Sequence, residues 1–298
     1  MRNVVELKAL MEKANDYWIA ENPNVGNNAW ERAAYFLGNM AAYDVLKKQK
    51  YLDYAIEWAN ANDWNFNRNE NHNTTNADNV SCGETYMDLM TKYGVEGKMT
   101  HMLETLEFTA QDEKNDYWWW IDTFYMALNF YTRMGLYLND DRLVDKAYRL
   151  YMNSKVERGC YDEEEGLWFR DERFLANVAR TLRTLPKEHK YYEEYRGVFV
   201  KMAEALRQCQ STDGFWRTSL LDPEEFDMPE TSGTALNVLG MIIGIREGLL
   251  DESGRIGWVQ VVALKPGNVR QEATNDYAVG TYLLICKELI EYIQWNNE

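Results

Sequence analysis

The chain has 298 residues, of which 46% are hydrophobic and 14% aromatic, and this composition excludes a disordered chain. Its 32 basic and 48 acidic residues give a formal net charge of −16, which disfavours nucleic acid or an anionic membrane as a partner. The 11 tryptophans and 20 tyrosines exceed what a core requires, so we expect a binding site lined with aromatic side chains. The first residues do not resemble a signal peptide and no apolar run could span a bilayer, so we expect a cytoplasmic or periplasmic protein.

Apolar residues spaced at i, i+3 and i+4 predict about eleven helices. In chain order these cover residues 4–20, 29–46, 51–62, 82–93, 95–110, 122–134, 141–154, 176–185, 191–210, 232–247 and 276–295. The breaks between them are short and polar, as at 93–94, 134–135 and 185–186, which makes successive helices antiparallel neighbours. Strand-like alternation occurs only at 167–169, 215–217 and 257–261, which we assign to loops.

The recurring unit is a helical hairpin of roughly 40–50 residues, which could stack as an open solenoid or close into a ring. A solenoid would show a more regular consensus and fewer aromatic loops. We therefore expect an all-α protein, a closed α/α toroid formed by one domain over residues 1–298.

Residues that bind metals or exchange protons at neutral pH are scarce. The four cysteines are widely spaced and form no CxxC pair, so we predict neither a metal site nor a disulfide framework. Of the three histidines, we place His101 and His189 on solvated helix faces and His72 in an asparagine-rich loop. No two of them form a pair for proton abstraction and return, which argues against a sugar 2-epimerase on the same helical ring.

The stretch most suggestive of chemistry is 116–127, where three consecutive tryptophans precede Asp122 at the start of a helix. Aromatic planes beside an acid suit a sugar ring and a proton transfer, so Asp122 is the candidate acid/base of a carbohydrate-active enzyme. The alternative is a helix N-cap, a role that aspartate favours. Adjacent tryptophans cannot all face one core, and we expect Trp120, nearest Asp122, to face the substrate.

Six motifs occur along the chain in the order of one family: ADNVSCG at 77–83, WIDTFYM at 120–126, GLWF at 166–169, DGFWR at 213–217, ETSGTA at 230–235 and TNDYAVG at 274–280. With them the chain resembles, over nearly its whole length, the unsaturated rhamnogalacturonyl hydrolases of glycoside hydrolase family 105. These are relatives of the family 88 unsaturated glucuronyl hydrolases. The resemblance implies an (α/α)6 barrel, a ring of six helical hairpins.

The resemblance also implies a reaction, the hydration of the 4,5-double bond of an unsaturated uronic acid at the non-reducing end of a lyase-generated oligosaccharide. An aspartate at the position of Asp122 protonates C4 and activates the water that adds to C5. The resulting hemiketal opens and releases the neighbouring sugar, and the aspartate matching Asp78 assists in the same site. No cofactor is implied, and we expect a monomer acting on fragments of pectic rhamnogalacturonan.

Further substrate-binding candidates lie in the loops. Trp168 and Trp216 are candidate sugar platforms, with structural wedges beneath the loops as the alternative. Arg217 is a candidate substrate contact, although an ion pair with Glu230 that fixes the loop is the favoured interpretation. Arg170 stands where the family often has a histidine, and its guanidinium is a candidate partner for the uronate carboxylate.

Two segments of the family pattern are missing, near 174–176 and near 252–253. The first resembles WxRGNGW in the family, and the second is a helix of the barrel. Because a barrel without one helix would expose its core, we expect the natural barrel to contain both. The alternatives to a pectic hydrolase are a glucuronyl-specific enzyme acting on glycosaminoglycan-type disaccharides and a non-catalytic glycan-binding protein on the same fold.

Overall fold

A computed structural model describes residues 3–66, 76–119, 121–169, 174–225, 230–250 and 275–296. The predictions for Trp120, Arg170 and His72, and those for 252–253 and 257–261, lie outside the described residues.

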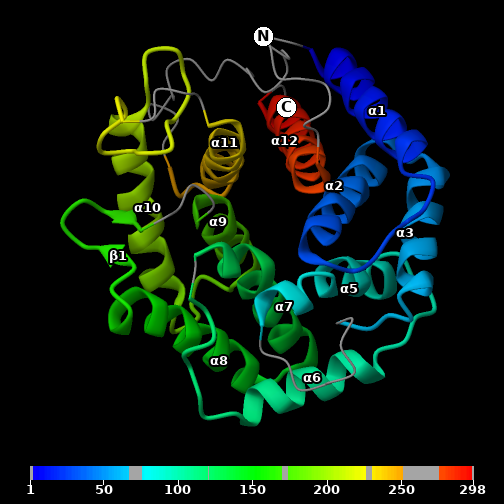
Figure 1. Cartoon of the computed structure of the whole chain (residues 1–298), viewed down its shortest axis with the longest axis horizontal. Helices are drawn as coiled ribbons and strands as arrows, with labels where there is room; N and C mark the ends of the chain where they lie inside the picture. The colour runs from blue at the N-terminus through cyan, green and yellow to red at the C-terminus, as the bar shows by residue number, and fades with distance from the viewer. Residues whose placement is uncertain are drawn as a thin grey trace.

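The helices form two concentric layers (Figure 1). The outer layer contains α1 (Val4–Glu21), α3 (Gln49–Ala61), α6 (Thr100–Gln111), α8 (Asp141–Met152) and α10 (Tyr192–Cys209). The inner layer contains α2 (Trp30–Leu46), α5 (Gly83–Thr91), α7 (Asn129–Leu138), α9 (Phe174–Thr184), α11 (Thr231–Arg246) and α12 (Asp276–Trp295). Inner helices are buried on several sides, as α11 is, and so carry apolar residues all round, whereas outer helices such as α8 bury one face. This arrangement confirms the expected (α/α)6 barrel.

The chain runs repeatedly from an outer helix to the next inner helix, and these connections share one end of the barrel. We call it the loop end. It comprises the N-terminal turns of the inner helices and the described segments that lead into them: 22–29, 62–66, 76–82, 112–123, 158–169 and 210–225. The motifs that carry the family resemblance therefore fall on one face of the molecule.

Helices α2 and α12, the first and last of the inner layer, close the ring by backbone-to-backbone packing. A Cβ on Gly280 would lie 2.1 Å from the carbonyl oxygen of Ala34, and one on Gly38 would lie 2.3 Å from that of Gly280. Only glycine permits this approach. The seam between the two ends of the chain thus depends on two residues without side chains.

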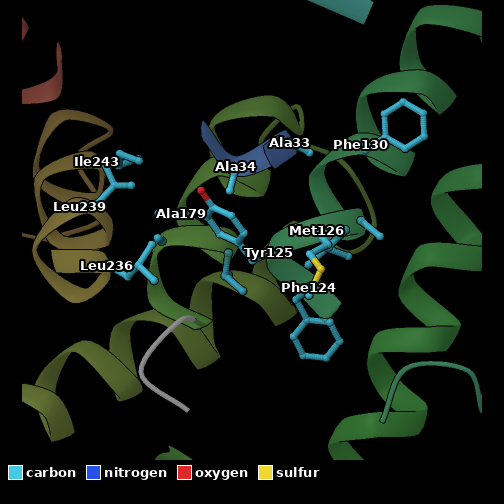
Figure 2. Close-up of a cluster of buried hydrophobic side chains, with 14 of the residues drawn as sticks. Ala33, Ala34, Phe124, Tyr125, Met126, Phe130, Ala179, Leu236, Leu239 and Ile243 are labelled. Atoms are coloured by element: carbon cyan, nitrogen blue, oxygen red, sulfur yellow. The ribbon is translucent and has the colours of Figure 1, made fainter. Parts of the chain in front are cut away.

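Buried charge and apolar packing together fill the ring. Glu288 on α12 pairs with Arg183 on α9 at 2.7 Å and also with Arg246 on α11, so that three inner helices share one carboxylate. Glu84 on α5, only 1% exposed, pairs with Arg180 on α9 in the same way. Figure 2 shows the apolar part, where α11 contributes Leu236, Leu239 and Ile243.

Three local expectations were wrong. The helix expected to end at 134 runs on to Leu138, because Gly135 packs against Val144 instead of breaking the helix. Helix α6 begins at Thr100, five residues after the predicted start at 95. His101 is 9% exposed, and its Nδ1 accepts a hydrogen bond from the backbone of Phe66 at 3.1 Å, so it is a buried structural residue.

The structure also contains short elements. Periodicity does not reveal α4 (Ala77–Val80), the π-helical turns η1 (Phe124–Leu128) and η2 (Asn153–Glu157), or strand β1 (Tyr161–Asp162). Strand β2 (Leu167–Trp168), which pairs with β1 in antiparallel fashion, lies in the 167–169 segment with strand-like alternation. All of them belong to, or directly adjoin, the loop end.

Candidate functional site

Asp122 lies at the entry to an inner helix. It is itself helical and half-buried, and the chain continues through η1 into α7. All five residues of η1 are buried, so the π-helical turn is held by the core. Such turns are rare and occur frequently at functional sites. The helix cap position before η1 belongs to Thr123, so the structure does not show Asp122 as its N-cap.

Asp78 is the second residue of α4, a short helix capped by the Asn76 side chain, which accepts a hydrogen bond from the Asp78 backbone at 3.0 Å. Helix α4 packs against η1, which brings Asp78 toward Asp122. Burial raises the pKa of Asp78, and the charge of Asp122 raises it further, followed by that of Glu31. Two carboxyl groups from distant parts of the sequence therefore act on one another at the loop end.

The same face extends onto α2 and α12. Trp30 stacks on Tyr277, with ring centroids 5.6 Å apart and planes at 28°. Beside this pair, Arg32 Nε lies 3.2 Å from a carboxylate oxygen of Asp276. Burial and the charge of Glu31 raise the pKa of Asp276, and they outweigh the lowering effect of Arg32. Sequence reasoning assigned no role to these residues, although Asp276 lies in one of the quoted motifs.

The inner helices point their N-termini at this face. A helix N-terminus presents unpaired N–H groups and a partial positive charge, which favours an anion. The convergence of several such termini offsets locally the repulsion that a net charge of −16 exerts on an anionic sugar. The site can therefore hold a carboxylate beside two interacting carboxyl groups.

Two of the predicted sugar platforms lie in the core. Trp168 is 4% exposed and packs against Phe124 and Tyr161. Trp216 is fully buried, and its Nε1 donates to the Leu206 carbonyl at 2.7 Å. Neither ring presents a free face to a sugar in this structure. Their burial fits the alternative interpretation from the sequence, in which each tryptophan is a structural wedge beneath its loop.

Arg217 also has a structural partner. It forms an ion pair with Asp213 at 2.8 Å, and this bond fixes its loop. Glu230, the partner expected for Arg217, caps α11 by accepting hydrogen bonds from the Ser232 and Gly233 backbones. A loop-fixing role for Arg217 was anticipated, and Asp213 is a partner that the sequence analysis did not name.

The side chains of Trp118 and Trp119 have opposite environments, one in the core and the other at the surface. Trp118 is fully buried and packs against Phe124 and Tyr131, whereas Trp119 is 58% exposed. The expectation that these neighbours cannot share one core is confirmed for this pair. Trp119 was not singled out from the sequence, since nothing in the pattern distinguishes it from Trp120.

Within the described residues, no group of three or more His, Cys, Asp or Glu side chains is arranged to hold a metal ion. A search of the same residues finds no helix with both the length and the apolar character needed to cross a bilayer.

An (α/α)6 barrel hosts more than one activity, so the class of protein is given by its family match and not by the fold alone. The chain belongs to Glycosyl Hydrolase Family 88, whose sequence model matches residues 5–178 and 174–260. This match confirms the family relationship indicated by the motifs.

Known proteins of similar sequence and structure agree with this assignment. An unsaturated 3S-rhamnoglycuronyl hydrolase from Formosa agariphila is 25% identical over 359 aligned positions, covering 97% of this chain and 92% of the relative. Among solved structures, a glycosyl hydrolase family 88 protein from Bacteroides vulgatus is 26% identical with a TM-score of 0.85, covering 98% of this chain and 100% of that one. A protein described as a polysaccharide lyase is 28% identical with a TM-score of 0.88, and 98% of each chain is covered. A family 105 hydrolase from C. acetobutylicum shares the fold at 19% identity and a TM-score of 0.71, covering 96% of this chain and 99% of that one.

Proposed function

We propose that this glycoside hydrolase removes a 4,5-unsaturated uronic acid from the non-reducing end of lyase-generated oligosaccharides by hydrating the double bond. The observation that carries the proposal is the interaction between Asp78 and Asp122 at the loop end. The name of the Formosa agariphila relative, which specifies an unsaturated rhamnoglycuronyl substrate, supports it.

The chemistry requires one proton donor and one activated water. Burial and the charge of Asp122 raise the pKa of Asp78, so this carboxyl keeps its proton to a higher pH than an isolated carboxyl would. Asp122 delivers a proton to C4 of the double bond, and its carboxylate then accepts a proton from the water that adds at C5. Asp78 holds the water or the ring by hydrogen bonding. The C5 hemiketal then opens and releases the neighbouring sugar.

For the substrate, we propose an unsaturated uronate linked to rhamnose, as in pectic rhamnogalacturonan. Trp120 and Arg170 remain proposed as its aromatic wall and its carboxylate partner. The family match falls into two pieces that meet at 174–178, which supports the proposal that a family segment is missing near 174–176. A further missing segment near 252–253 and a single domain over 1–298 also remain proposals.

The direct test is ultraviolet absorbance, since the conjugated double bond absorbs and its hydration removes the signal. Wild-type protein should bleach an unsaturated rhamnose-linked disaccharide, and Asp122→Asn should abolish this loss while keeping the wild-type circular dichroism. Running a hexosamine-linked disaccharide beside it separates the rhamnogalacturonyl substrate from a glycosaminoglycan-type one. If the wild type binds the disaccharide without bleaching it, the interpretation as a glycan-binding protein would replace the hydrolase assignment.

A lyase is the second candidate, favoured by the similarity to a protein described as a polysaccharide lyase. The two activities give opposite signals, because a lyase creates the double bond that a hydration consumes. Incubation with intact, saturated polysaccharide should leave the absorbance unchanged if the hydrolase assignment is right. A rise in absorbance would establish the lyase.

A further inference from the structure

The loop end carries an exposed aromatic surface beyond the two carboxyl groups. Trp119 is 58% exposed and Phe169 is 71% exposed. The backbone amide of Phe169 donates to the Cys160 carbonyl at 2.7 Å, and Cys160 Sγ lies 3.8 Å from the Trp119 carbonyl. The two aromatic residues therefore stand on adjoining backbone segments, one leading into η1 and the other following β2.

A guanidinium covers one face of the Trp119 ring. The Cζ of Arg158 lies 4.4 Å from the ring centroid, which is a close cation–π contact. Arg158 Nη2 donates to the Asp116 carbonyl at 2.8 Å, which joins the end of η2 to the segment that bears Trp119.

Arg158 retains unused charge. Within the described residues it forms no ion pair, and its buried Nε has no hydrogen-bond partner. The neighbouring Lys155 is different, since it pairs with Glu163 at 3.0 Å and with Glu194 at 2.8 Å. In a chain of net charge −16, an arginine that has no carboxylate partner among the described residues and lies beside an open aromatic face suits an anionic sugar.

The platform lies close to the reacting bond. Trp119 precedes Asp122 by three residues, so their Cα atoms are at most about 11 Å apart. Trp118, next to Trp119, and Ile121, next to Asp122, are both buried, so each of the two positions adjoins an anchored residue. This separation is within reach of the sugar that follows the unsaturated uronate.

We propose that Trp119, Arg158 and Phe169 form a binding site for the sugar released by the reaction, and that Arg158 selects a sugar bearing an anionic substituent. The ring of Trp119 stacks on the sugar, and the guanidinium donates to a sulfate ester or a carboxylate on it. The kinetic part of this inference rests on the proposed hydrolase function, with a rhamnose that bears an anionic substituent in place of the uncharged rhamnose of pectic rhamnogalacturonan. The binding part does not.

The test compares three unsaturated disaccharides whose leaving sugar is uncharged, sulfated or carboxylated, with Trp119→Ala, Arg158→Gln and, as a matched control, Trp295→Ala. Trp295 is 51% exposed at the far end of α12. Arg158→Gln should raise KM for a charged leaving sugar about tenfold, since a charge-assisted hydrogen bond is at stake. Trp119→Ala removes the stacking face and should raise KM for all three leaving sugars. Arg158→Gln should remove the preference for a charged over an uncharged sugar, and the control should keep it. The two charged substrates identify the substituent that is recognised.

If Arg158→Gln changes KM equally for all three substrates, or changes it for none, the proposed selectivity is overturned. Dissociation of a dimer by Trp119→Ala in size-exclusion chromatography would mean that a second copy of the chain covers the surface, and it too would overturn the proposal. Calorimetric titration with saturated charged and uncharged disaccharides separates the two functions. If wild type hydrates nothing but prefers the charged sugar and loses that preference in Arg158→Gln, the hydrolase assignment fails and the platform stands.

Discussion

Asp122 raises the pKa of Asp78, second only to burial, although the two residues come from different elements of the barrel. The charge of Asp122 therefore disfavours the ionised form of Asp78. Asp122→Asn should remove the repulsion and lower the pKa of Asp78. Carboxyl-resolved NMR titration of wild type and variant measures this shift directly, and an unchanged Asp78 titration would show that the two groups do not interact.

The same substitution should remove the proposed acid/base group. We expect kcat for an unsaturated disaccharide to fall by about 10²–10⁴-fold, the usual contribution of general acid–base catalysis. Asp213→Asn is a suitable control, because Asp213 pairs with Arg217 in a loop and should leave kcat close to wild type. A loss below about tenfold in Asp122→Asn would assign the proton transfer elsewhere.

The ionised side chain of Asp78 should destabilise the folded protein at neutral pH. Its pKa in the folded state lies above the ordinary value of 3.8, so the folded protein binds this proton more tightly than the unfolded chain does. The associated stability is present below pH 3.8 and is lost as the pH rises through the raised pKa. Asp78→Asn should therefore raise Tm at pH 7 and lose this advantage toward acid pH.

Calorimetric Tm values over a pH series test this sign. Asp112 provides the opposite case, because a hydrogen bond from Tyr117 lowers its pKa. Asp112→Asn should therefore bring no gain at neutral pH. A lower Tm for Asp78→Asn at pH 7 would contradict the assignment of Asp78 as a strained, functional carboxyl.

The seam between α2 and α12 should tolerate no side chain. Gly280→Ala would place a Cβ 2.1 Å from a backbone oxygen, so the helices must move apart. We expect a loss of about 1–3 kcal/mol in the free energy of unfolding, measured by urea denaturation. Gly197 in α10 is the matched control, since a Cβ there meets nothing within 4 Å. Gly197→Ala should stabilise the protein by about 0.5–1 kcal/mol, and equal effects would refute the close crossing.

The carboxylate of Glu288 should be needed for the stability of the folded helical ring. Burial alone would raise its pKa, but the hydrogen bonds and charges of Arg183 and Arg246 outweigh burial and lower it. The stability it contributes is present above its unfolded pKa and is lost as the pH falls through the folded one. Glu288→Gln leaves two arginines short of a counter-charge and should cost about 3 kcal/mol at pH 7. The exposed pair of Glu204 and Arg207 is the control, and Glu204→Gln should have no measurable effect.

Periodicity predicted most helices because inner and outer helices both bury long apolar faces. It failed where packing decides: Gly135 reads as a break in the sequence but fits against Val144 in the structure. The short helix α4 and the two π-helical turns have too few residues to show a period.

For the site, the motifs named positions but not their roles. The family resemblance placed Asp78 and Asp122 in one site, and in the structure α4, which carries Asp78, packs against η1, which follows Asp122 closely in the chain. It could not tell that Trp168 and Trp216 are buried, since a tryptophan in a loop looks the same as a platform or as a wedge. It also missed Arg158, whose relation to Trp119 depends on two loops meeting in space.

Because a π-helical turn follows Asp122, the direction in which its carboxylate points depends on the number of residues in that turn. Hydrogen bonds in such a turn span one residue more than in an α-helix. Deleting a single residue from Phe124–Leu128 would let the segment become α-helical and would swing Asp122 by about 100° around the helix axis. In this fold an insertion or deletion of one residue can therefore switch the acid away from its substrate while every side chain keeps its identity.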